Sequence, residues 1–226
     1  MIHVHSCMEM NSSNPGRGNS PVTMYLRPVI TVVIGMCLLA GCTLLPEPQT
    51  VAVNKYVLEY NPVAAASGDT SKLPVVIITV PRAHGGYNTS RIAYRKQHFG
   101  LQYYAKSRWA DTPARMLAPL VAEAVSDTGE FQGLYASPGA LSARYRLDSE
   151  LIHFHQDFTV QPSEVHITLR AQLVGLDNNR VIASRLIDIR EAADSEDAYG
   201  GVQAANRAST RLLGELAQFC RAGTGR

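Results

Sequence analysis

Between positions 164 and 173, apolar and polar residues alternate without a break, and this pattern constrains the fold more than any other in the chain. A period of two is typical of a strand that buries one face and exposes the other. The turn sequences Gln161-Pro162-Ser163 and Asp177-Asn178-Asn179 stand on either side of it. Because such short connections join antiparallel neighbours, we expect a three-stranded meander over about 145–190. Its buried face is expected to consist of Val165, Ile167, Leu169, Ala171 and Leu173.

Two amphipathic helices are predicted beside this meander. Asp111-Thr112-Pro113 combines a capping oxygen with a proline in the first turn, and apolar residues recur at helical spacing after it. This predicts a helix over about 112–128, which Pro119 should bend. A second apolar stripe predicts a helix over about 195–220. Cys220 continues that stripe and is expected to pack as a small hydrophobic residue.

The first half of the folded part is expected to supply further strands. The run Val75–Val80 is continuously apolar apart from one threonine and rich in β-branched residues, as in a strand buried on both faces, which implies helices on two sides of a sheet. Strands are also expected at 56–60 and 101–109, with a short extended piece at 91–94 between them. The order of three strands, a helix, three strands and a helix predicts a single α/β domain with a mixed sheet.

The N-terminal segment has the organisation of a secretion signal. Arg27 precedes the uncharged stretch Pro28–Leu39, and Ala40-Gly41-Cys42 follows. Twelve helical residues span about 18 Å, which is too short for a hydrocarbon core of about 30 Å. The sequence around Cys42 resembles the lipoprotein box of bacteria, so we expect cleavage between Gly41 and Cys42 and lipid on the Cys42 sulfur. Ordinary secretory cleavage with Cys42 incidental and a buried apolar segment are the alternatives.

This signal divides the chain into three parts. Residues 1–41 form the signal region, in which Met24 opens a compact signal and 1–23 are either untranslated or an extended n-region. Residues 42–54 form the lipidated N-terminus and tether, and 55–221 form the folded domain. Thr43 after the cysteine, in place of the Asp that marks retention in the inner membrane, favours the periplasmic face of the outer membrane.

The search for catalytic and metal-binding chemistry gives no strong candidate. A net charge of +2 excludes a nucleic-acid binder driven by charge, and no serine-hydrolase, phosphate-loop or zinc-protease motif occurs. No catalytic residue, cofactor or metal is therefore expected. His153, His155 and His166 are the one metal-like cluster. The register implied by a turn centred on Gln161 places His155 opposite Ile167 and puts His166 on the other face.

The segment from 70 to 110 holds seven Lys and Arg residues, no acidic residue, and six of the chain's aromatic residues. One interpretation is that core aromatics alternate with solvated charges. The other is a contact surface for anionic lipid headgroups or for an acidic protein patch, because Arg, Tyr and Trp favour interfaces. A downstream acidic group over 188–197 leaves head-to-tail self-association open. The best contact candidates are Arg91, Tyr94, Arg95 and Lys96.

Several segments resemble the ABC-type transport auxiliary lipoprotein component family over about residues 50–220. The most specific is Tyr103-Tyr104-Ala105 leading into Arg108-Trp109-Ala110-Asp111-Thr112-Pro113, preceded by Thr89-Ser90-Arg91-Ile92-Ala93-Tyr94. Tyr56-Val57-Leu58, Tyr145-Arg146-Leu147, the stretch from Phe154 to Phe158 and Ala204-Ala205 continue the likeness, from which Pro119 departs.

The resemblance implies a lipid-anchored accessory without enzyme activity in the transport of lipids between the inner and outer membranes. It implies an Mce-type substrate-binding protein, an ABC permease and an ATPase as partners. The alternative from another class is a lipid-anchored periplasmic hydrolase with an unrecognised site.

Overall fold

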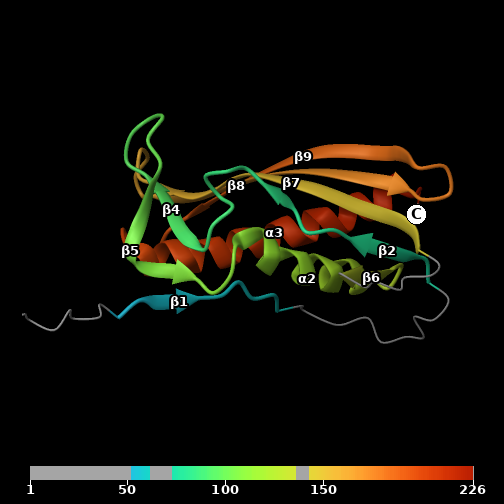
Figure 1. Ribbon diagram of the computed structural model, residues 1–226, viewed down its shortest axis with the longest axis horizontal. Coiled ribbons are helices and arrows are strands. Elements are labelled where there is room, and N and C mark those ends of the chain that lie inside the picture. The colour runs from blue at the N-terminus through green and yellow to red at the C-terminus, as the bar shows by residue number, and fades with distance from the viewer. Residues whose placement is uncertain (1–51, 62–72, 136–142, 226) are drawn as a thin grey trace, which may run out of the picture. The chain divides into compact units, whose positions relative to one another are not determined.

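The computed structural model describes residues 52–61, 73–135 and 143–225 (Figure 1). Gly41, Cys42 and the expected signal lie outside these ranges. The described residues form two helices and one mixed sheet, which confirms the predicted α/β domain. The elements are β1 (Asn54–Tyr56), β2 (Val75–Ile78), β3 (Arg82–Ala83), β4 (Arg91–Arg95), β5 (Gln102–Trp109), α2 (Pro113–Ser126), β6 (Gln132–Tyr135), β7 (Ala143–Asp157), β8 (Glu164–Gly175), β9 (Arg180–Ala192) and α3 (Ala198–Gly223).

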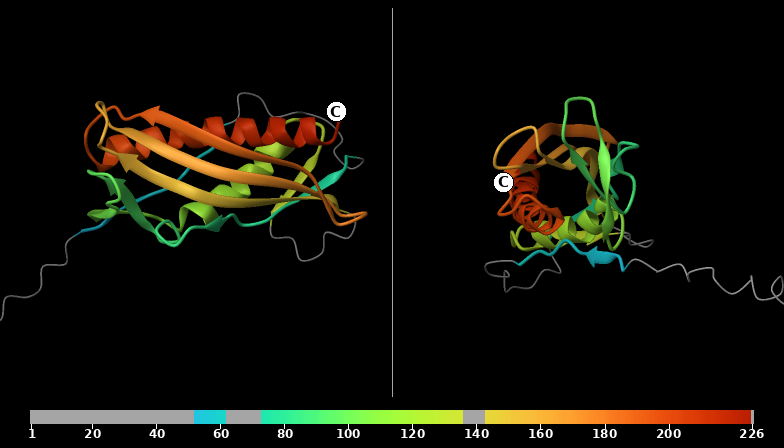
Figure 2. Two further views of the ribbon diagram at one scale, coloured as in Figure 1. Left: turned by 90° about the horizontal axis from the view of Figure 1, so that it is seen from above. Right: turned by 90° about the vertical axis from the view of Figure 1, so that its left-hand side faces the viewer.

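The meander of β7, β8 and β9 is antiparallel, as predicted, and its strands are the longest in the sheet (Figure 2). On its other edge β7 pairs in parallel with three short strands in succession: β2 at one end, β3 in the middle and β4 at the other end. β5 joins β4 antiparallel and β1 joins β5 in parallel, while β6 extends the sheet beyond β2. The ends of β4, β5 and β7 therefore meet at one end of the domain.

Both helices pack against each other, α2 on β2 and β6 and α3 on β8 and β9 (Figure 2). The predicted apolar face of β8 lies against them, and all five of its residues are buried. Helix α3 begins after Asp197, whose carboxylate accepts the Gly200 N–H at 2.8 Å. Cys220 is buried in this helix, and burial raises the pKa of its thiol to about 12. No helix of the described ranges is long and apolar enough to cross a membrane.

Three local expectations require correction. The first strand of the described residues is Asn54–Tyr56, so residues 57–60 of the strand expected at 56–60 lie outside it. β2 is buried on one face only, with Val76 and Ile78 inside and Val75 and Ile77 half-exposed, because both helices cover the same side of the sheet. Helix α2 covers the predicted span and contains Pro119, but its N-cap is Thr112, whose hydroxyl makes no capping bond.

Candidate functional site

Three aromatic rings gather where β4, β5 and the end of β7 meet. The ring of Tyr94 lies 4.7 Å from that of Tyr104 and 5.9 Å from that of Phe158, measured between centroids. The Phe158 N–H donates to the Arg95 carbonyl at 2.8 Å and holds this ring beside β4. With Lys96, Gln161 and Glu196 these rings line a depression of about 330 Å³, which we call the aromatic hollow.

Opposite charges lie on the rim of the aromatic hollow. The Lys96 ammonium is 5.8 Å from the centroid of Tyr94 and 6.0 Å from that of Phe158, within the range of cation–π attraction. Lys96 is exposed and makes no ion pair with a described residue. Glu196 is also exposed and accepts the Ser163 N–H at 2.8 Å. An apolar floor with a charge of each sign suits an amphipathic partner surface.

The floor of the hollow is fixed by polar contacts behind it. The Tyr104 hydroxyl donates to Gln156 Oε1 at 2.9 Å, and Gln156 Nε2 donates to Ser163 Oγ at 2.9 Å. Gln156 and Ser163 are both buried, so these bonds are shielded from water. Burial raises the pKa of Tyr104, which therefore stays a neutral donor.

The four predicted contact residues separate into three environments. Tyr94 and Lys96 belong to the aromatic hollow. Arg95 instead donates to the buried carboxylate of Asp157 at 2.9 Å and serves the fold. Burial raises the pKa of Asp157, but the bonds from Thr159 and the charge of Arg95 outweigh it, so this pKa lies below its ordinary value. Arg91 lies over the ring of another tyrosine, Tyr103, with 4.1 Å from Cζ to the ring centroid.

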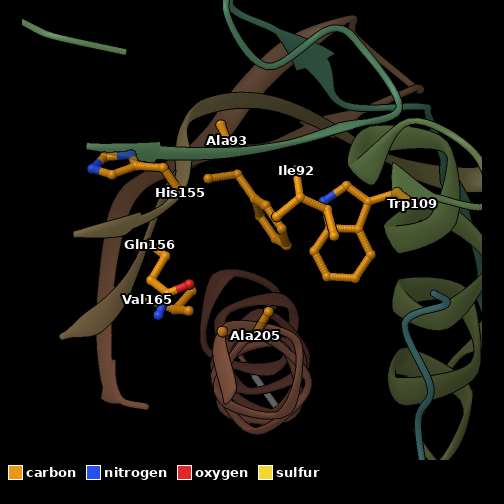
Figure 3. A pocket seen from close by; sticks show the side chains of 9 residues that line it. Ile92, Ala93, Trp109, His155, Gln156, Val165 and Ala205 are labelled. Carbon is orange, nitrogen blue, oxygen red and sulfur yellow. The ribbon is translucent and has the colours of Figure 1, made fainter. Parts of the chain in front are cut away.

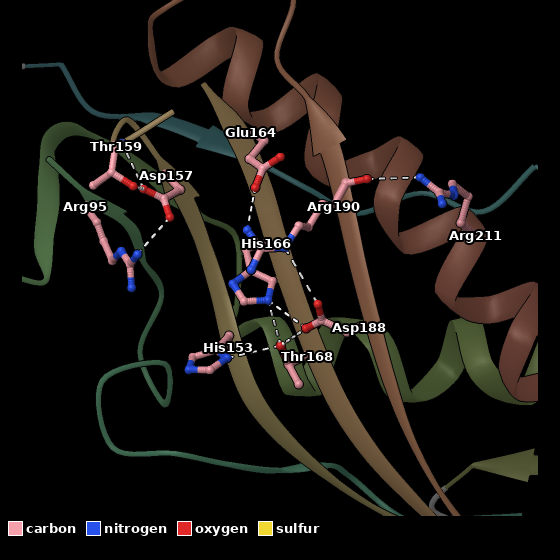
Figure 4. A network of polar contacts seen from close by, with 10 residues as sticks. All are labelled: Arg95, His153, Asp157, Thr159, Glu164, His166, Thr168, Asp188, Arg190 and Arg211. Atoms are coloured by element: carbon pink, nitrogen blue, oxygen red, sulfur yellow. Dashed lines mark hydrogen bonds and ion pairs between the residues drawn. The ribbon is translucent and has the colours of Figure 1, made fainter. Parts of the chain in front are cut away.

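The histidines lie together, which contradicts the predicted register. Figure 4 shows two of them, His153 and His166. His155 pairs with His166, not with Ile167, and both rings lie within 5.8 Å of the ring of His153. The cause lies at the turn: Asp157 pairs with Glu164, so the turn is centred between Val160 and Gln161 and the register differs by one residue from the predicted one, which puts His155 and His166 on the same face. A bulge between Leu151 and His153 then shifts the pairing of the rest of β7 by one further residue.

A network of hydrogen bonds ties this histidine cluster to β9. His166 Nε2 lies 2.7 Å from Asp188 Oδ1 and 2.9 Å from Thr168 Oγ1, and Thr168 also donates to Asp188. The Tyr87 hydroxyl covers the cluster at 3.1 Å from His155 Nδ1. Burial, together with the neighbouring charge of His166, lowers the pKa of His155 to about 3.

The arrangement of this network differs from those of hydrolytic and metal sites. In a nucleophile–histidine–carboxylate triad the hydroxyl and the carboxylate bind different ring nitrogens. Here Thr168 and Asp188 approach the same atom, Nε2 of His166, so the carboxylate does not orient a base toward the hydroxyl. Among the described residues, no group of three or more His, Cys, Asp or Glu side chains is arranged to hold a metal ion.

A small gap lies between the sheet and α3, beneath Trp109 (Figure 3). It is lined by side chains of β4, β5, β7 and β8, which are apolar except for His155 and Gln156, and by Gly201 and Ala205 of α3. Its volume is about 10 Å³, which is room for about one water molecule. This gap cannot hold an acyl chain.

Sequence reasoning identified part of the aromatic hollow. Tyr104 belongs to the predicted basic and aromatic segment and Glu196 to the predicted acidic group. Gln161 was assigned only to the turn after β7, and Phe158 only to the family-like stretch at the end of the strand before that turn. Two other members of the acidic group form ion pairs inside the domain: Glu191 and Asp194 both pair with Arg207 of α3.

Comparisons with known proteins match most of the chain. The model of a family described as ABC-type transport auxiliary lipoprotein component matches residues 56–217. The crystal structure of protein XCC0632 from Xanthomonas campestris has a TM-score of 0.66 and 22% identity, covering 76% of this chain and 97% of that one. A crystal structure of an uncharacterized protein has a TM-score of 0.59 and 12% identity, covering 75% and 99%. These two likenesses establish the fold alone. No curated protein matches the chain as a relative.

Proposed function

This chain belongs to the ABC-type transport auxiliary lipoprotein component family, and from that premise we propose that it is a non-catalytic docking module of an Mce-type lipid transport system. In this proposal Cys42 carries the lipid anchor on the periplasmic face of the outer membrane. The folded domain receives the periplasmic end of an Mce-type substrate-binding protein, whose permease and ATPase lie in the inner membrane.

The observation that carries the proposal is the aromatic hollow. Its three rings supply an apolar contact area, and Lys96 and Glu196 supply one charge of each sign beside it. Interfaces are enriched in such aromatic residues, and charges at the rim steer association more than they raise affinity. The small volume beneath Trp109 supports docking in preference to storage of a lipid inside the domain.

The experiment is an association measurement between the purified chain and the Mce-type protein of the same bacterium. Lys96→Glu reverses the rim charge without disturbing an ion pair, whereas the same change at Arg95 would place a second carboxylate against Asp157. We expect Lys96→Glu to slow association several-fold at low salt, with the difference shrinking as salt rises. Tyr94→Ala should accelerate dissociation.

Arg180→Glu is the matched control, because Arg180 is an exposed cation at the start of β9, at the other end of the domain (Figure 1). Association rates that are equal for Lys96→Glu and Arg180→Glu would refute docking at the hollow. Affinity purification of the lipidated chain tests the wider proposal: recovery without any Mce-type protein, permease or ATPase would contradict it.

A further inference from the structure

Four exposed cations line up across neighbouring strands near the start of the domain. Lys55 of β1 pairs with Arg108 of β5, and Arg108 pairs with Arg91 of β4 on its other side. Their neighbours Tyr56, Trp109 and Ile92 turn toward the core, so the three cations project from the opposite, outer face. Lys106 stands two residues before Arg108 and is also exposed. We call these four residues the basic ladder.

The basic ladder is not neutralised within the described residues. β1, β4 and β5 contain no acidic residue, and none of the four cations forms an ion pair with a described side chain. Like charges directly opposite each other on paired strands destabilise a sheet. By contrast, Arg82 and Arg95 of the same sequence segment each have a carboxylate partner. An external anion would relieve the repulsion within the basic ladder.

The loop that joins β4 to β5 carries a second unusual feature. Phe99 is fully exposed, although its ring is large and apolar. Its backbone has a φ of 63°, a left-handed conformation that a bulky residue rarely adopts. Such strain persists only when something else favours it and is concentrated at functional positions. The hairpin therefore has cations on its paired strands and an apolar ring at its tip.

We propose that the basic ladder and Phe99 dock the domain onto the anionic phospholipid surface of the membrane in which Cys42 is anchored. This inference rests on the lipid anchor of the proposed function. Among the described residues β1 is the first strand after Cys42, and with 11 residues between them Cys42 and Asn54 lie at most about 40 Å apart. A surface that close to the anchor meets lipid headgroups before any soluble partner. Cations attract anionic headgroups, and an exposed aromatic ring partitions into the interface.

The test uses the chain's single tryptophan. Trp109 is the residue after Arg108, so energy transfer from Trp109 to a dansyl-labelled lipid headgroup measures how closely the basic ladder approaches the membrane. The full lipidated chain is reconstituted into vesicles of phosphatidylcholine alone, or with one third phosphatidylglycerol, at low and high salt. We expect strong transfer only with phosphatidylglycerol at low salt. Each cation near an anionic surface contributes about 1 kcal/mol, which raises the ratio of docked to undocked protein about fivefold.

Replacing Lys55, Arg91 and Arg108 with glutamine should therefore lower the ratio of docked to undocked protein on the order of 100-fold and leave only the effect of lipid charge that Lys106 supplies, about fivefold. Phe99→Ser should weaken transfer while its salt dependence remains. The control replaces Arg82, Arg144 and Arg180, exposed cations of β3, β7 and β9, with glutamine. It should behave like the wild type.

Two results would overturn the inference: wild-type transfer that is the same in both kinds of vesicle, as expected if the basic ladder binds an acidic protein, or equal losses in the two triple variants. The anchor is tested separately. Co-flotation of the chain with neutral vesicles at high salt requires only the lipid on Cys42 and does not involve the basic ladder. If the chain does not float with these vesicles, the proposed function is contradicted, whatever the energy-transfer result.

Discussion

Trp109 offers the most direct test of which aromatic residues in the segment from 70 to 110 stabilise the fold and which are free to contact a partner. It is 3% exposed at the end of β5, and its ring meets that of Phe154 edge to face at 5.6 Å between centroids. Truncating a buried large aromatic to alanine costs about 3–5 kcal/mol. In a domain of 150–250 residues each kcal/mol moves the melting midpoint by about 2–4 °C. We therefore expect Trp109→Ala to lower the midpoint by about 6–20 °C.

The assay is thermal melting followed by far-ultraviolet circular dichroism, since the variant has no tryptophan fluorescence. Phe99→Ala is the matched control, because it removes an aromatic ring that is fully exposed. It should leave the midpoint unchanged within about 2 °C. A Trp109→Ala midpoint equal to that of the wild type, together with lost binding to a partner, would refute the structural role and make Trp109 a contact residue.

Three other predictions concern the histidine cluster, α3 and the anchor. His155 has a pKa of about 3 in the folded protein against 6.5 when unfolded, so its contribution is complete above pH 6.5 and lost as pH falls toward 3. Urea unfolding should show about 2 kcal/mol less stability at pH 5.0 than at 7.5 from His155, and His155→Gln should remove most of the difference, the remainder coming from His153, whose pKa burial also lowers. Gly201→Ala should lower the free energy of unfolding by about 1–3 kcal/mol, because the added Cβ would lie 2.2 Å from Gln156 Oε1. At Gly214 the added Cβ meets open space, so Gly214→Ala should raise it by about 1 kcal/mol. Chemical denaturation measures both changes. Cys42→Ser should release the chain from the membrane fraction, and retention there would show that the anchor lies elsewhere.

The elements that could be predicted are those whose periodicity is long. The meander and both helices repeat their apolar residues over many positions, so the pattern identified each element and its buried face. β6 has no such pattern: all of its residues are half-buried, and it is four residues long. Its one signal is Gly133, where a Cβ would lie 2.2 Å from the Ala122 carbonyl oxygen and prevent the approach of α2.

The register of β7 against β8 could not be predicted from hydrophobic alternation. Alternation in β8 shows which side chains share a face, but it does not show where the partner strand contains an extra residue. The bulge near His153 changes the pairing along one part of β7 and leaves the hydrophobic alternation of β8 intact. The pairing of His155 with His166 is set on the turn side of this bulge, where Asp157 pairs with Glu164, so the composition of the histidine cluster depended on a register that hydrophobic periodicity does not encode.

Charge counts in the sequence likewise could not separate cations that serve the fold from cations that are free to bind. Arg95 and Arg91 are four residues apart in a stretch without acids, yet Arg95 reaches Asp157, which the β4–β7 pairing brings beside it. Arg91 is paired with Arg108 instead, and the pairing there brings only another cation. Strand pairing thus decides which charges are compensated. Substitutions that treat the segment as one surface would mix a loss of stability with a loss of binding, whereas Lys96 and the basic ladder can be changed without breaking an ion pair among the described residues.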